Sequence, residues 1–184
     1  MKRKKKIILL SHCILNSNSK VEGLSQYEGI FKEILDRIYD KGIGVIQLPC
    51  PEMIMYGIKR WGHVKEQFDT LFFREGCRDM LKPIIGQTKS YLDTGYEVLG
   101  VIGIDGSPSC GVNFTCSGDW EGDDSSKDDI NHKIKDLKEV SSSGVFMEEL
   151  KKYMEEYNIS IPFVAINEKD VFSSLESINF FLNK

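Results

Sequence analysis

The chain has 184 residues, of which 41% are hydrophobic, and its formal net charge is −4. This length is enough to bury a core and favours one domain over residues 1–184. A weakly acidic chain has no overall attraction for nucleic acid or an anionic membrane. The longest apolar runs also fall far short of the roughly 20 residues of a membrane-spanning helix. Composition therefore argues against nucleic-acid and membrane partners, and it leaves the oligomeric state open.

The N-terminal stretch KRKKKIILLSHC combines a basic leader, an apolar run and Cys13, as a lipoprotein signal does. Residues 7–10 form too short a run, however, because an export signal has roughly 7–15 apolar residues. His12 also stands where a small residue should precede the cysteine. We therefore expect a buried first strand and a cytoplasmic location. Reducing conditions there keep an odd set of five cysteines as free thiols or metal ligands.

Short, continuous apolar runs predict four strands that are buried on both faces, as in a parallel sheet. The predicted strand segments, each built around such a run, cover residues 4–13, 44–49, 96–105 and 159–167. Helical spacing of apolar residues predicts helices over 26–39 and 142–158, and a last helix that begins near Asp170.

Three further segments can be assigned from the sequence. A helical tract covers residues 63–93, and Pro83 is expected to break or kink it, with Gly76 and Gly86 as further dividing points. Ser141 to Ser143 are candidate caps for the helix that follows them. Residues 113–143 have few apolar anchors and contain the acidic run WEGDDSSKDD. They are predicted to form a polar, loop-like insertion that could act as a lid.

The alternation of strands and helices predicts an α/β fold of the Rossmann-like kind. Such a fold has three layers, with a parallel sheet between helices on both faces. Ligands of such sheets bind in the crevice beyond the carboxyl ends of the strands. We therefore expect the functional site at that edge.

Three cysteines follow the first three predicted strands: Cys13, Cys50 and Cys110. Neighbouring parallel strands lie about 4.8 Å apart, so these loops can converge on one small object. Three thiolates suit an iron–sulfur cluster, a copper(I) centre or a zinc centre. A four-iron cluster held by only three cysteines keeps one iron open to a ligand. The alternative is that each thiol packs as a small hydrophobe, which we expect of Cys77 and Cys116.

Polar and aromatic residues flank these thiols. Glu52, two residues after Cys50, is a candidate general acid or base, but it could equally be a first-turn charge that the helix dipole favours. The loop of Cys110 contains two serines, Ser107 and Ser109.

Tyr56 and Trp61 follow Glu52 in the stretch MIMYGIKRW. They could stack on a planar base, or they could simply belong to the core. No GxGxxG or Walker A pattern supports phosphate binding.

The motifs SHCIL at 11–15, LPCPE at 48–52 and GSPSCG at 106–111 resemble those of the thiouracil desulfidase (TudS) family. The resemblance covers roughly residues 5–115. It implies that Cys13, Cys50 and Cys110 hold a [4Fe-4S] cluster.

It also implies that Glu52 and Ser107 form an acid/base and substrate-positioning pair. Ser109, Tyr56 and Trp61 are further candidates for contact with the substrate.

The activity that the resemblance implies is hydrolytic removal of sulfur, without net redox change, from a small thiolated heterocycle such as thiouracil. The chain departs from the family pattern at Asn16, where a glycine is common, and at Ser19, where a second cysteine is common. The substrate ring is therefore unassigned. The alternatives are a non-catalytic protein that binds a cluster or sulfide, and a zinc or thiol site that binds a nucleobase-like ligand.

Overall fold

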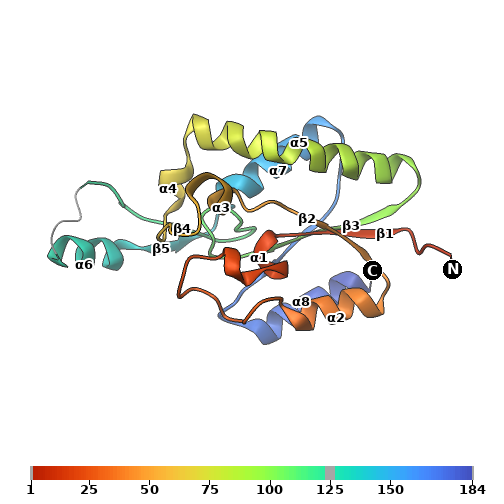
Figure 1. Ribbon diagram of the computed structural model, residues 1–184, viewed down its shortest axis with the longest axis horizontal. Coiled ribbons are helices and arrows are strands. Elements are labelled where there is room, and N and C mark those ends of the chain that lie inside the picture. Colours follow the sequence, from red (N-terminus) through yellow and green to blue (C-terminus); the bar gives the residue numbers. More distant parts are fainter. Residues whose placement is uncertain (1, 123–126, 184) are drawn as a thin grey trace.

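The computed structural model of the chain describes residues 2–122 and 127–183 (Figure 1). Its main sheet has four parallel strands in the order β2-β1-β3-β6. The strands are β1 (Lys6–Leu10), β2 (Gly44–Gln47), β3 (Glu97–Ile104) and β6 (Phe163–Ile166). All four predicted strands are confirmed, although each is shorter than its apolar run. The predicted α/β fold, with helices on both faces of a parallel sheet, is likewise confirmed.

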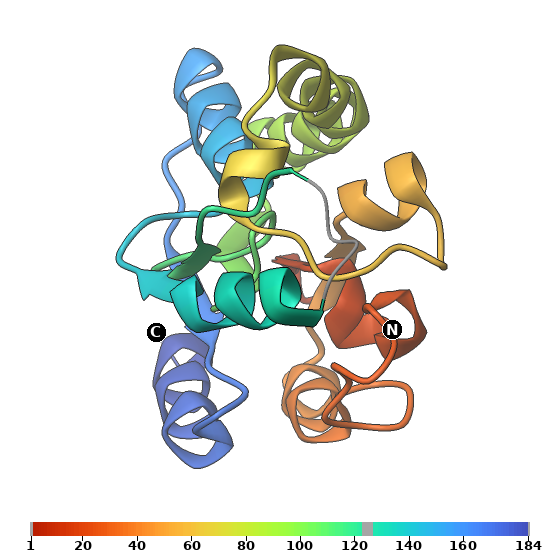
Figure 2. The ribbon, with the colours of Figure 1, turned by 90° about the vertical axis from the view of Figure 1, so that its left-hand side faces the viewer.

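Two pairs of helices cover the two faces of this sheet (Figures 1 and 2). One face carries α5 (Leu71–Asp93) and α7 (Val145–Glu156), and the other carries α2 (Lys32–Asp40) and α8 (Val171–Leu182). Successive residues of β1 alternate between the two cores: Leu9 packs toward α5 and α7, while Ile8 and Leu10 pack toward α2 and α8. These three side chains are fully buried, and each such burial contributes roughly 1.5–3 kcal/mol. The continuous apolar run of β1 is therefore explained by burial on both sides.

Helix α5 runs without interruption through Gly76, Pro83 and Gly86, so the expected division of the tract at these residues is wrong, while a kink at Pro83 stays a prediction. The buried face of α5 repeats at helical spacing through Phe73, Cys77, Leu81 and Ile85, and it packs against α7. Pro83 lies on the exposed face, where the backbone carbonyl that loses its donor can be hydrated. Tertiary packing of the opposite face thus outweighs the cost of the proline.

Two helix starts also differ from the sequence prediction. Helix α2 begins at Lys32 rather than near residue 26, and Ile30 is 56% exposed instead of facing the core. The cap of α7 is Gly144 rather than a serine, since Ser143 instead donates its hydroxyl to the carbonyl of Val112. The last helix does begin directly after Asp170, which caps it.

The predicted insertion is more ordered than its composition suggests. It contains β4 (Thr115–Ser117), α6 (Lys127–Asp136) and β5 (Lys138–Val140), and the two strands form a small antiparallel sheet. Part of the acidic run, residues 123–126, lies outside the described residues. The insertion lies on the side of the molecule toward which the main strands point (Figure 1). The expected loop-like character is therefore replaced by regular structure in β4, α6 and β5, and the role of the insertion as a lid stays a prediction.

Four short helical segments lie in the connections that follow the first two strands. They are α1 (His12–Leu15) and η1 (Ser17–Ser19) after β1, and α3 (Pro51–Tyr56) and α4 (Lys65–Phe68) after β2. None of the helices in the described ranges combines the length and apolar character that crossing a membrane would need.

Candidate functional site

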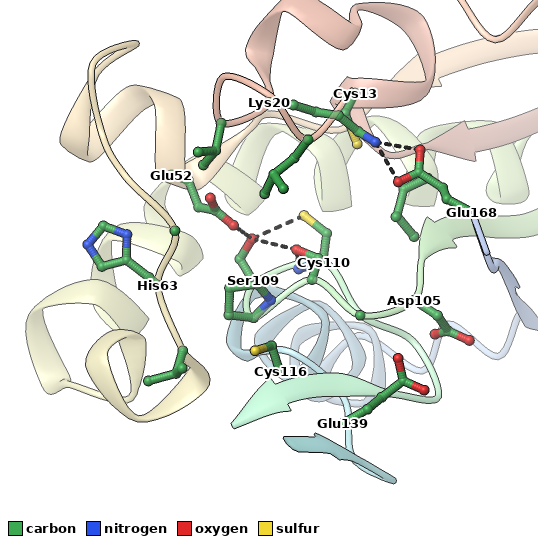
Figure 3. A pocket seen from close by; sticks show the side chains of 18 of the residues that line it. Cys13, Lys20, Glu52, His63, Asp105, Ser109, Cys110, Cys116, Glu139 and Glu168 are labelled. Atoms are coloured by element: carbon green, nitrogen blue, oxygen red, sulfur yellow. Dashed lines mark hydrogen bonds and ion pairs between the residues drawn. The ribbon is translucent and has the colours of Figure 1, made fainter. Parts of the chain in front are cut away.

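A cavity of about 710 Å³ lies at the carboxyl ends of the parallel strands (Figure 3). The chain first lays β2 on one side of β1 and then β3 on the other, which makes this edge the topological switch point where α/β sheets bind ligands. Cys13, Cys50 and Cys110 all line this cavity. The structure thus brings together three thiols that are far apart in the sequence.

Each of the first two thiols is presented by a short helix that starts where a strand ends. Cys13 lies in α1, and its carbonyl accepts a hydrogen bond from the hydroxyl of Tyr27 at 3.0 Å. Cys50 is the N-cap of α3, and its sulfur accepts from the backbone N–H of Met53 at 3.5 Å. Pro51 occupies the first helical position, which favours a helix start at this point. The CPE motif therefore places a thiol at the cap and a carboxylate in the first turn.

The loop that carries Cys110 is held by its own polar groups. The hydroxyl of Ser107 accepts from the backbone N–H of Cys110 at 3.0 Å. One carboxylate oxygen of Asp105, at the end of β3, accepts from three backbone N–H groups of residues 112–114 at 2.8–3.2 Å. These bonds fix the loop without help from a ligand.

Two glycines let this loop lie close to neighbouring backbone. A Cβ on Gly111 would come within 2.2 Å of the carbonyl oxygen of Phe114. A Cβ on Gly144, at the start of α7, would come within 2.5 Å of the carbonyl carbon of Ser109. The backbone N–H groups of Val145 and Met147 donate to loop carbonyls at 3.1 and 3.2 Å. Helix α7 thus fixes the Cys110 loop in place by direct contact between main chains.

Burial keeps the three thiols protonated in the metal-free protein. It raises the pKa of Cys13 to about 12, against which nearby Lys20 acts weakly, and it raises the pKa of Cys110 well above its ordinary value. Burial also raises the pKa of Cys50, opposed by the N–H of Met53. Charge on Cys50 raises the pKa of Cys13, and charge on Cys50 or Cys13 raises the pKa of Cys110, so the three thiols lie within electrostatic reach of one another. A metal that binds here must displace protons, and binding is therefore pH-dependent.

Glu52 is buried beside the thiols and paired with Arg60. Its Oε2 accepts from Nε of Arg60 at 3.1 Å, and its Oε1 accepts from the hydroxyl of Ser109 at 2.5 Å. Arg60 also donates to the carbonyl oxygens of Ser19 at 2.6 Å and Gly57 at 3.2 Å. The guanidinium gives Glu52 a buried counter-charge and ties together loops that follow β1 and β2. Glu52 is at once a first-turn residue of α3 and a member of the site.

The predicted serines have different surroundings. Ser109 is the residue that contacts Glu52, and its hydroxyl also lies 3.5 Å from the sulfur of Cys110. Ser107 lines the cavity, but its hydroxyl lies 3.3 Å from that of Ser109 and receives the Cys110 N–H. The geometry therefore gives Ser109 the direct link to the carboxylate, and Ser107 orders the turn.

The two predicted aromatic residues do not line this cavity. Tyr56 packs against His63, Phe68 and Phe73, with ring centroids 5.2–6.2 Å apart. Trp61 is 53% exposed and meets Trp120 edge to face. Trp120 itself lines the cavity. Stacking of Tyr56 or Trp61 on a substrate stays a prediction.

Sequence reasoning missed several members of the site. Arg60 has no motif around it, and its only signal is a pair of basic residues, Lys59 and Arg60, within a largely apolar stretch. Lys20 forms an ion pair with Glu168, and both of these largely buried side chains line the cavity beside Cys13. Cys116, expected in a core, lines the cavity and is partly exposed, whereas Cys77 is fully buried in the core as expected.

The donor set has the chemistry that a cluster takes, because thiolates are soft ligands of iron–sulfur clusters. Three thiols line one cavity, and each comes from a different strand end. Among the described residues, no group of three or more His, Cys, Asp or Glu side chains has the arrangement of a site for a single metal ion. Binding of a cluster by the three thiols stays a prediction.

The comparisons with known proteins give one relative. The chain is 36% identical over 168 residues to the uncharacterized protein MJ0003 of Methanocaldococcus jannaschii, and the match covers 90% of each chain. No family model matches the chain, and no solved structure matches it.

Proposed function

We propose that this chain, which belongs to the same family as the uncharacterized protein MJ0003 of Methanocaldococcus jannaschii, is a desulfidase. It removes sulfur hydrolytically from a small, thiouracil-like heterocycle in the reducing cytosol, where free thiols persist. Because MJ0003 itself has no assigned activity, the proposal depends on the site.

A single observation carries the proposal. Three thiols at the ends of three parallel strands share a cavity with a buried carboxylate, and a serine joins that carboxylate to one of the thiols. A cysteine set that only filled core volume would have no need of Glu52, Arg60 and Ser109 beside it.

The residues that would hold a [4Fe-4S] cluster are Cys13, Cys50 and Cys110. When bound, the cluster supplies an open, Lewis-acidic iron that can take a soft sulfur atom. Glu52, paired with Arg60, accepts a proton from the water that adds to the thiocarbonyl carbon. Ser109 orients the other oxygen of that carboxylate.

The reaction balances without an oxidant or a reductant. Water supplies the oxygen that the ring keeps, and its two hydrogens leave with the sulfur as hydrogen sulfide. The buried position of Glu52 limits competing bulk water around the base, since only 9% of its surface is exposed.

The first test measures iron and acid-labile sulfide per chain after anaerobic reconstitution. We expect about four of each in the wild type and a loss of both in Cys110→Ala. The matched control is Cys116→Ala, which removes a thiol that lines the same cavity and should retain the cluster. Absence of iron from the wild type, with its thiols intact, would refute the proposal.

The second test addresses turnover. The Glu52→Gln variant should retain iron but desulfurate 2-thiouracil or 4-thiouridine at least about 100-fold more slowly. Full turnover by this variant would remove Glu52 as the base. Iron without turnover of any thiolated heterocycle by the wild type would leave a cluster-binding protein in place of an enzyme.

A further inference from the structure

The cavity is much larger than a single pyrimidine ring. Its volume of about 710 Å³ lies in the range of pockets that enclose drug-sized ligands, roughly 300–1,000 Å³. It extends from the thiols to β5 and to the loop after β6, where Glu139 and Lys169 line it. The wall between these ends includes apolar side chains: Val21, Leu24, Trp120 and Leu137. We call the part of the cavity lined by Glu139 and Lys169 its outer half. A free base held at the thiols would leave this outer half empty.

The charges along the cavity wall are balanced. Among the described residues, each cationic side chain that lines the cavity pairs with a carboxylate: Lys20 with Glu168, Arg60 with Glu52, Lys138 with Asp136, and Lys169 with Glu139. The remaining titratable base of the wall is His63. Burial lowers the pKa of His63, which keeps the ring neutral near pH 7.

We infer that the thiolated ring enters this site as part of an uncharged nucleoside, and not as a free base or a phosphorylated nucleotide. This inference rests on the proposed desulfidase function, because that proposal supplies the thiolated ring. A phosphate in the outer half would meet the carboxylate of Glu139, and each cation among the described lining residues is already paired. Such repulsion is a common means of rejecting a wrong ligand.

Ribose hydroxyls, by contrast, are suited to paired carboxylates. A carboxylate has about four acceptor positions, and the contact between Glu139 and Lys169 uses only Oε2 of the glutamate, at 3.0 Å from the lysine Nζ. Neutral hydroxyls can therefore donate to Glu139 without breaking the ion pair. A carboxylate that accepts from a ribose hydroxyl at the edge of a parallel sheet is a recurrent arrangement.

The test compares the binding of uracil, uridine and uridine 5′-monophosphate to the reconstituted protein by isothermal titration calorimetry. None of these probes contains sulfur, so binding is read without turnover. We expect uridine to bind roughly tenfold more tightly than either of the other two, as one or two added hydrogen bonds would give. Equal binding of uracil, tighter binding of the monophosphate, or no binding of uridine would overturn the inference. A protein that fails to desulfurate could still show the uridine preference, so failure of the proposed function is separately visible.

Two variants test the charge argument itself. Glu168→Gln frees Lys20 and should shift the ratio of monophosphate to uridine affinity roughly tenfold toward the nucleotide at low salt. Glu139→Gln frees Lys169 at an exposed position, so it should fold normally and shift the ratio in the same direction by a smaller factor. The matched control is Glu155→Gln, an exposed carboxylate on α7 away from the cavity, which should leave the ratio unchanged. If the ratio of monophosphate to uridine affinity were unchanged in both Glu168→Gln and Glu139→Gln, the carboxylates of the cavity would not be what excludes a phosphate.

Discussion

Cys77 and Cys110 are both shielded from solvent, with 0% and 7% of their surfaces exposed, but their surroundings differ. Cys77 lies on the packed face of α5 between Phe73 and Leu81, and it does not line the cavity. Cys110 lines the cavity and lies close enough to two other thiols for their charges to affect its pKa. Burial alone therefore does not mark a functional cysteine, whereas convergence from separate strand ends on one cavity does.

The largest expected contrast between the two kinds of cysteine is in iron content. Cys50→Ala should bind no cluster, because only two of the three thiolates remain. Cys77→Ala should bind as much iron as the wild type, and it should lower the free energy of unfolding by about 1–2 kcal/mol through the small cavity that it leaves. Iron analysis together with urea denaturation measures both. Loss of iron from a well-folded Cys77→Ala protein would break the distinction.

The next effect concerns the polar groups that accompany Cys110 but not Cys77. Arg60→Met leaves the carboxylate of Glu52 buried without its counter-charge and should lower the free energy of unfolding by about 3 kcal/mol. The double variant with Glu52→Gln should recover much of that loss, since the unpaired charge is gone. Thermal melts of the single and double variants read this directly. Equal stability of Arg60→Met and the wild type would show that the ion pair is not required to hold the loops.

The effect with the narrowest range of conditions is on alkaline stability. Burial raises the pKa of Cys77 from 9.0 to about 12, so in the unfolded chain this thiol loses its proton at lower pH than in the folded one. Its contribution to stability is complete below about pH 9 and is lost as the pH rises toward 12. Cys77→Ala should therefore show a shallower fall of stability between these values, measured by denaturant unfolding at a series of pH values. An identical slope in both proteins would contradict the assignment.

The sheet could be predicted from sequence because its signal is local. The strands are continuous apolar runs, and parallel order follows from their alternation with helices. The positions of Cys13, Cys50 and Cys110 then follow from the geometry of such a sheet. The expectation for Pro83 was wrong because it considered the proline alone. The apolar repeat of α5 leaves Pro83 on the exposed face, and packing of the opposite face against α7 keeps the helix continuous.

The polar contacts of the site were less accessible to sequence reasoning. Ser107 and Ser109 are equivalent in the sequence on either side of Pro108, and only the fold shows that Ser109 meets Glu52. The role of Arg60 depends on the turn at Gly57, which has a φ of +79°. This turn reverses the chain after α3, so that the side chain of Arg60 reaches back to the first turn of that helix. Contacts of this kind arise from loop geometry and not from spacing along the chain.

The hydroxyl of Ser109 carries a single hydrogen, although it lies within reach of two acceptors, Oε1 of Glu52 at 2.5 Å and the sulfur of Cys110 at 3.5 Å. It can donate to only one of them at a time. A thiolate at Cys110 would thus compete with the carboxylate of Glu52 for the hydrogen bond that Ser109 donates. Rotation of the Ser109 hydroxyl about its C–O bond can therefore transfer its hydrogen bond from Glu52 to Cys110, so the charge on the sulfur affects how many hydrogen bonds the carboxylate accepts.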